Sequence, residues 1–145
     1  MRRLAVFLCT LCLALPLMAA DNAKPERKEQ FGELTVHYNA FASSVLQPAI
    51  AEGEGLIRSK AQGVLTIAVL KSGKATPANV TGNVKDLTGR EKTLTFKQSK
   101  DAVYYIAQFA VDPNASAIYT FTVNVKAGNE DAHSFSFNQE IYSGD

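Results

Sequence analysis

The sequence predicts an all-β protein, folded as a single antiparallel β-sandwich of about seven strands. Three observations lead to this prediction. From residue 31 onward, apolar and polar residues alternate with a period of two in several runs, which is the pattern of strands with one buried and one solvent-facing side. Clusters of Gly, Pro, Asn and Asp separate these runs at the spacing of a sandwich. A chain of 145 residues also fits one domain.

Residues 1–20 have the composition of a cleavable secretory signal peptide. Arg2 and Arg3 precede an uncharged apolar run over residues 4–15, and small residues close the segment at 19–20. This order of positive, apolar and small residues is typical of export signals. The run is too short to cross a bilayer of about 30 Å as a helix, so we expect cleavage after residue 20 and no membrane span in the mature chain.

The segment that follows the signal, residues 21–30, is almost wholly polar. It cannot bury enough apolar surface to offset the entropy lost on ordering, which predicts a flexible tail and places the sandwich domain at residues 31–145. Both cysteines and both methionines lie within residues 1–20. Since disulfides are then not available as cross-links, the mature domain has to fold by burying apolar surface alone.

The strand predictions follow the alternation along the chain. Half-buried strands are expected around residues 33–38, 118–125 and 134–138. Residues 64–70 and 103–109 are apolar on nearly both sides and predict central strands. Turns are expected between the runs at Ser72-Gly73, Asp86–Gly89, Asp112–Asn114 and Ala127–Asn129.

Residues 41–60 break the period of two. This segment is rich in alanine and other small residues, and Pro48 and Gly53 flank a short stretch within it. Proline is favoured at the first helical position and glycine just past the end of a helix, which predicts a short helical turn between these two residues. We call residues 41–60 the crossover and expect them to cap one end of the sandwich.

No metal or cofactor site is predicted. The histidines are His37 and His133, and residues 21–145 contain no cysteine or methionine. Copper(I) prefers thiolate and thioether ligands, which residues 21–145 lack. Zinc takes about three or four protein ligands, and His37, His133 and a carboxylate such as Asp131 would supply three only if they met at an edge of the sandwich. The alternation also places His37 on the polar side of its strand and His133 on an apolar side, which separates the two imidazoles.

The sequence predicts no catalytic residue, and an enzyme is the less favoured class. It lacks the Gly-x-Ser-x-Gly motif of serine hydrolases, and both cysteines leave with the signal. Glu52 and Glu54 are neighbouring carboxylates in the crossover, but we expect solvated charges there rather than the two acids of a glycosidase. The formal net charge is only +1, and without a basic run no nucleic-acid partner is predicted.

The most distinctive polar cluster is Arg58-Ser59-Lys60. A guanidinium can bind a carboxylate or a phosphate through two hydrogen bonds, so one interpretation is a contact with an anion or a partner. The other interpretation, which we favour, pairs Arg58 with Glu52 or Glu54, so that an ion pair attaches the crossover to the sandwich.

Four short segments, taken together, carry a likeness to a known family. They are His37–Phe41, Leu46–Pro48, Ile57–Lys60 and Tyr104–Ala107. With them the chain resembles the small exported proteins of Gram-negative proteobacteria that form the family "domain of unknown function 4426", over essentially the whole mature chain. The resemblance implies a periplasmic location and an immunoglobulin-like β-sandwich. It implies no activity and no catalytic residues, because the family has no established activity.

The candidate binding residues are the positions that match the pattern of this family: His37, Tyr38, Asn39, Arg58, Ser59 and Lys60. We expect a periplasmic, non-enzymatic binding or accessory module of the cell envelope, with another envelope protein as its partner and an oligomeric state that the sequence leaves open. The alternative is a small-ligand-binding protein or an enzyme with its site near the crossover. A concave apolar pocket would favour this alternative, and an open sheet edge or a flat exposed patch would favour a protein partner. For the fold, the alternative is a small closed β-barrel.

Overall fold

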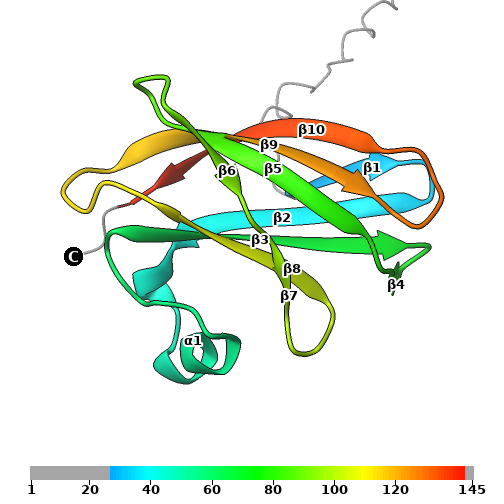
Figure 1. Cartoon of the computed structure of the whole chain (residues 1–145), viewed down its shortest axis with the longest axis horizontal. Coiled ribbons are helices and arrows are strands. Elements are labelled where there is room, and N and C mark those ends of the chain that lie inside the picture. Colours follow the sequence, from blue (N-terminus) through cyan, green and yellow to red (C-terminus); the bar gives the residue numbers. More distant parts are fainter. Residues whose placement is uncertain (1–26, 143–145) are drawn as a thin grey trace, which may run out of the picture.

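Two antiparallel β-sheets pack face to face in the computed structural model, which describes residues 27–142 (Figure 1). The first sheet has the strand order β1-β2-β3-β8-β7, with β4 paired to the end of β3, and the second has the order β10-β9-β5-β6. The predicted antiparallel sandwich is confirmed, and the described strands do not close into a barrel. The expected signal peptide and residues 21–26 of the expected tail lie outside the described residues.

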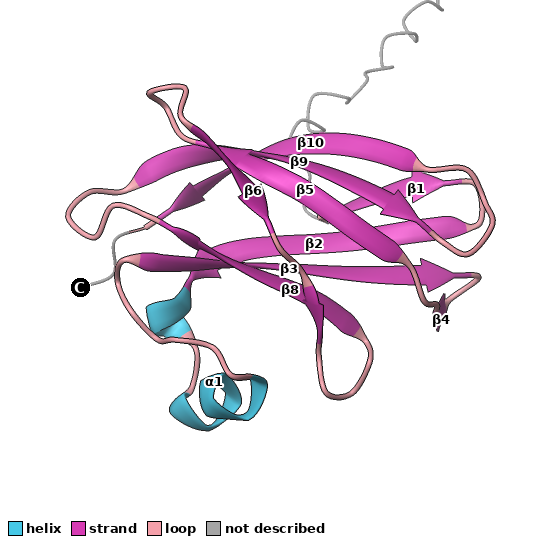
Figure 2. Ribbon diagram, viewed as in Figure 1, coloured by secondary structure: helices cyan, strands magenta, loops and turns pink. Residues whose placement is uncertain are grey.

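The elements of the described chain are mostly strands (Figure 2). The first sheet contains β1 (Lys28–Phe31), β2 (Leu34–Ala42), β3 (Gln62–Lys71), β4 (Lys74–Ala75), β7 (Lys97–Gln98) and β8 (Tyr104–Ala110). The second contains β5 (Asn79–Lys85), β6 (Glu91–Leu94), β9 (Ala117–Lys126) and β10 (His133–Ile141). The crossover contains a 3-10 turn, η2 (Ser43–Val45), and the helix α1 (Pro48–Glu54). The described residues form ten strands, and seven remain when the short strands β1, β4 and β7 are left out, in agreement with the predicted number. These three strands are too short to show a period of two in the sequence. Between residues 27 and 142, no helix has the length and apolar character needed to cross a membrane.

β1 begins inside the segment that the sequence predicts to be a flexible tail. Lys28 pairs with His37 in antiparallel register, so residues 28–30 belong to the first sheet. Their polar composition concealed the strand, because strand pairing uses backbone N–H and C=O groups and requires no apolar side chains. Phe31 then holds the strand against the second sheet by stacking on His133 of β10, with ring centroids 4.5 Å apart.

The central strand β3 is buried on both sides, as its apolar run predicts. Leu65 and Ile67 belong to the core between the sheets. Val64 and Ala68 point to the outer side of the sheet and are also buried. The outer side of a two-layer sandwich is covered only where another element lies over it, and the crossover packs near Val64 on this side.

Aromatic rings from both sheets meet in the middle of the core. Phe121 of β9 is fully buried, and its ring stacks on Phe137 of β10 with 5.0 Å between centroids. It also meets the ring of Phe109 of β8 edge to face, at 5.1 Å. Phe137 in turn stacks on Tyr38 of β2, at 4.1 Å. These contacts connect two strands of each sheet, and each aromatic pair contributes about 0.5–1.5 kcal/mol beyond the burial of its area.

Two tyrosine hydroxyls join the sheets outside this cluster. Tyr105 of β8 accepts a hydrogen bond from the backbone N–H of Ala78, just before β5, at 2.9 Å. Tyr119 of β9 accepts one from the backbone N–H of Asp112, just after β8, at 3.1 Å. In each case a side chain from one sheet binds the backbone of a loop of the other sheet, so the loops are fixed relative to the core.

The helix α1 begins as predicted but ends two residues later than predicted. Pro48 occupies its first turn, and the helix continues through Gly53 to end at Gly55. Gly55 has a φ of 70°, the left-handed conformation that glycine adopts at little cost. Its N–H and that of Leu56 bind carbonyls of the last turn, with Leu56 N to Ala51 O at 2.8 Å. Gly53 keeps a helical conformation, so the prediction that it ends the helix is wrong.

We expect Gly82→Ala to destabilise the protein by about 1–3 kcal/mol, the usual cost of extra volume in a packed core. A Cβ atom at Gly82 in β5 would lie 2.5 Å from the backbone oxygen of Thr122 in β9, and backbone cannot move aside without breaking the sheet. The free energy of unfolding, measured by urea titration and circular dichroism, checks this.

Gly53→Ala is the matched control for that substitution. A Cβ at this position meets nothing within 4 Å, and alanine replaces glycine in a helix with a gain of about 0.5–1 kcal/mol. Equal urea midpoints for Gly82→Ala and the wild type would contradict the close approach of β5 and β9.

Candidate functional site

The three predicted site residues in β2 do not converge on one site. His37 and Asn39 are exposed on the outer side of the first sheet, and Tyr38 points into the core. Burial raises the pKa of the Tyr38 hydroxyl above its ordinary value of 10.0, and the nearby carboxylate of Glu29 acts in the same direction. Tyr38 is therefore a neutral core residue that stacks on Phe137.

Arg58 attaches the crossover to itself through backbone carbonyls. Its Nε donates to Leu46 O at 2.8 Å and its Nη2 donates to Ser44 O at 3.2 Å. The structural role that we favour therefore has backbone partners instead of the expected carboxylates. Ser44 lies within η2 and Leu46 directly after it, and carbonyls at the end of a short helical turn lack a partner within the turn. Glu54 instead accepts a hydrogen bond from the β7–β8 hairpin, as described below.

Ser59 fastens the end of the crossover to its beginning. The hydroxyl of Ser43, which is fully buried, donates to Ser59 O at 3.0 Å and accepts from Ser59 N at 2.9 Å. The hydroxyl of Ser59 accepts a hydrogen bond from Ala61 N at 2.9 Å. Lys60, next to it, is exposed. Arg58 and Ser59 thus hold the crossover in position.

The concave site of this region is a groove between the crossover and the outer side of the first sheet, with a volume of about 370 Å³. We call it the crossover groove. Its floor consists of Phe41, Val64 and Ile106 from β2, β3 and β8, and its walls of Leu46, Ile50 and Leu56 from the crossover and Tyr104 from β8. Ile50 is 52 % exposed and Tyr104 is 43 % exposed, so apolar surface continues from the floor to the rim.

The groove exists because the crossover covers only part of an apolar sheet surface. The Gln108 side chain holds the crossover above β8 by two hydrogen bonds to the backbone of Ile57, from Ile57 N to Oε1 at 3.2 Å and from Nε2 to Ile57 O at 3.1 Å. The left-handed turn at Gly55 brings the chain back from α1 to this point. Between α1 and the β7–β8 hairpin, the sheet remains uncovered.

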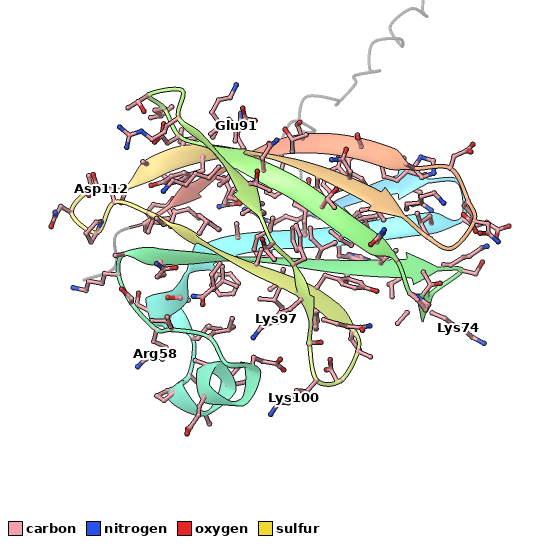
Figure 3. The ribbon with its side chains drawn as sticks, viewed as in Figure 1. Arg58, Lys74, Glu91, Lys97, Lys100 and Asp112 are labelled. Carbon is pink, nitrogen blue, oxygen red and sulfur yellow. The ribbon has the colours of Figure 1, made fainter. Side chains whose placement is uncertain are left out.

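The polar rim of the groove is formed by Glu54, Ser99, Asp101 and Thr66. The backbone N–H of Lys100 lies 3.2 Å from Glu54 Oε1, and Lys97 Nζ donates to Glu54 O at 2.6 Å. Figure 3 shows Lys97 between β7 and the end of α1. These two bonds join the helix to the hairpin and define the width of the groove.

Asp101 is held as an ionised acceptor at the rim. Its Oδ1 accepts from Ser99 Oγ at 2.5 Å and from Val103 N at 3.1 Å. The bond from Ser99, followed by that from Val103, lowers the pKa of Asp101 below its ordinary value of 3.8. Neither Glu54 nor Asp101 forms an ion pair within residues 27–142, so both carboxylates have capacity for a further donor.

Sequence reasoning named the location of this groove in its alternative hypothesis but missed the residues that line it. The sequence signal for the floor of the groove lies in residues 64–70 and 103–109, which are apolar on nearly both sides. In a two-layer sandwich, such a strand needs another element to cover its outer side. The sequence pairs Glu54 with Glu52, and no pattern around Asp101 marks it as a rim residue. Within residues 27–142, no three His, Cys, Asp or Glu side chains group as metal ligands.

Solved structures with the same fold include one close relative. A DUF4426 family protein from Pseudomonas aeruginosa PAO1 is 44 % identical, with a TM-score of 0.72, and the alignment covers 83 % of this chain and 97 % of that chain. A copper-bound variant of FetP from uropathogenic Escherichia coli strain F11 is 15 % identical, with a TM-score of 0.56 and 82 % and 95 % coverage. A copper-bound variant of Campylobacter jejuni P19 is 14 % identical, with a TM-score of 0.51 and 81 % and 94 % coverage. The last two share the fold alone.

No curated protein shows significant similarity to the sequence. The sequence model of a domain of unknown function, DUF4426, matches residues 28–144, which extends from the first residue of β1 to beyond the end of β10. The resemblance found in the sequence is thereby confirmed, and the protein belongs to the DUF4426 family.

Proposed function

We propose that this protein is a non-enzymatic binding module of the periplasm, which holds the apolar part of an amphipathic small molecule in the crossover groove. The groove itself carries the proposal. Its volume of about 370 Å³ falls in the range of small-ligand sites, about 300–1,000 Å³. Such sites have mostly apolar linings with a few polar groups at defined positions, and Ile50 and Tyr104 leave apolar surface open to solvent at this point.

The rim determines which polar group the ligand would carry. Glu54 and Asp101 are acceptors, and the lowered pKa of Asp101 keeps its carboxylate charged at neutral pH. The ammonium of Lys97, on the hairpin side of the groove, is bound to Glu54 O. A ligand with an apolar body and a cationic or hydrogen-bond-donating end therefore complements the groove better than an anionic one.

The export of the protein is supported by the signal-like sequence of residues 1–20 and by the periplasmic origin of one protein of the same fold, FetP, which was expressed in the periplasm of Escherichia coli. Copper binding, as in the copper-bound variants of FetP and P19, is not part of the function that we propose for this chain. Residues 21–145 contain no cysteine or methionine, the soft ligands that copper(I) prefers, and the likeness to those proteins concerns the fold alone.

Decylammonium, used below its micelle concentration, is expected to bind the purified protein more tightly than decanoate in isothermal titration calorimetry. Both probes are linear ten-carbon amphiphiles, and they differ in the sign of the head-group charge. The rim carboxylates should attract the ammonium and repel the carboxylate. Equal affinity for the two would contradict the role of Glu54 and Asp101, and absence of binding by both would contradict the groove as a ligand site.

Ile50→Ser is expected to weaken decylammonium binding by about fivefold to tenfold, since the half-exposed side chain contributes about 1 kcal/mol of apolar contact. Ile118→Ser is the matched control, because Ile118 is 44 % exposed on β9 in the other sheet. An equal loss in both variants would show binding to apolar surface in general rather than to the groove.

Asp101→Asn is expected to reduce stability at pH 7 and to have a smaller effect as the pH falls below 3.8. The folded state lowers the pKa of Asp101, so its carboxylate stabilises the fold above its ordinary pKa, and this contribution is lost as the pH falls through the lowered value. Urea unfolding at pH 7 and pH 3 measures it. Asp131→Asn, at an exposed loop position, serves as the control, and a pH-independent difference for Asp101→Asn would contradict the assignment.

A further inference from the structure

β10 differs from the other strands at the edges of the two sheets. The edge strands are β1, β7, β6 and β10. β1 and β6 have four residues each, of which two in each strand are charged, and β7 has two residues. Short and charged edges of this kind discourage the addition of another strand. β10 has nine residues, no proline and a single carboxylate, Glu140 near its end.

One edge of β10 has no strand partner in the described part of the chain. β10 pairs with β9 over its whole length, and no strand between residues 27 and 142 pairs with its other edge. The middle of this edge borders a cleft of about 270 Å³ between β10 and the β1–β2 hairpin, lined by Ser136, Phe137, Asn138, Tyr38, Arg27 and Glu29. Unpaired backbone N–H and C=O groups along such an edge can bind another extended segment.

β10 is also held in a regular conformation that suits pairing. All nine residues are in register with β9, without a bulge. On the outer side, Thr120 donates to Asn138 at 2.8 Å and the hydroxyls of Thr122 and Ser136 lie 3.1 Å apart. The edge is therefore ordered before any partner arrives, which lowers the entropy lost on association.

We propose that β10 is a self-association edge, to which a second copy of this chain adds its own β10 in antiparallel orientation. A two-fold axis at Phe137 would pair all nine residues of each strand. Ser136 would then lie opposite Asn138 of the second copy, and Ser134 opposite its Glu140. These are polar pairs like those between β9 and β10, and no two like charges face each other.

The charges beside the edge favour a second copy over an arbitrary peptide. Arg27 and Glu29 lie in the cleft next to β10 and have opposite charges. A two-fold interface brings the same patch of each copy together, and because the two charges cancel, the two patches meet without the net repulsion that patches of a single charge would have. The edge belongs to the second sheet and the crossover groove to the first (Figure 1), so this inference is independent of the proposed ligand site.

Analytical ultracentrifugation of the protein purified after export tests the proposal. The expected result is a dimer that dissociates on dilution. Ser136→Lys should raise its dissociation constant at least tenfold, because the two-fold axis brings the two new ammonium groups close together. Asn83→Lys is the matched control, since it adds the same charge to the same outer side on the interior strand β5 and should leave the dissociation constant unchanged.

Hydrogen–deuterium exchange provides a second measurement that needs no substitution. Amides of β10 should exchange more slowly as the protein concentration rises, and amides of the edge strand β6 should not. A protein that remains monomeric at all concentrations, with exchange in β10 independent of concentration, would overturn the proposal. A dimer weakened equally by both lysine variants would also overturn it, as would protection of β10 only by an added extended peptide.

Discussion

The stacking of aromatic rings between the two sheets is the contact on which the rest of this structure depends. Phe121 and Phe137 from the second sheet meet Tyr38 and Phe109 from the first, with centroid distances of 4.1 to 5.1 Å along the chain of rings. Flat rings in close contact bury a large apolar area and favour particular ring geometries, so they hold the inner sides of the two sheets together. Because residues 21–145 contain no cysteine, no disulfide can share this task, and the hydroxyls of Tyr105 and Tyr119 only secure the loops around it.

Since the core occupies the inner sides of both sheets, binding surfaces remain only on the outer sides and at the edges. The crossover modifies one outer side. Arg58, Ser43 and Ser59 hold it through hydrogen bonds to the backbone. Of the positions that match the family pattern in this segment, Arg58 and Ser59 therefore shape the groove, and Phe41 and Leu46 line it. The apolar floor around Val64 and Ile106 is left as the surface available to a ligand.

The hairpin that forms the other side of the groove stores a small amount of backbone strain. Ala102 has a φ of 62°, a conformation that costs a residue with a side chain about 1–2 kcal/mol. Its N–H donates to Ser99 O at 2.9 Å, and the turn places the Asp101 carboxylate where Ser99 and Val103 both donate to it. The strained conformation of Ala102 thus accompanies the placement of the Asp101 carboxylate at the rim of the groove.

Elements with a local signal could be predicted from the amino-acid sequence. Alternation identified the inward and outward sides of β2, the two doubly apolar runs identified the central strands β3 and β8, and Pro48 marked the start of α1. Backbone pairing leaves no such signal in the sequence. The polar composition of β1 therefore predicts a tail, and the charge of Arg58 predicts carboxylate partners in place of the carbonyls that it binds. The crossover groove combines side chains from three strands, a helix and a hairpin between Phe41 and Ile106. Only the tertiary structure could bring them together, because their proximity follows from the packing of the sheets and not from any period along the chain.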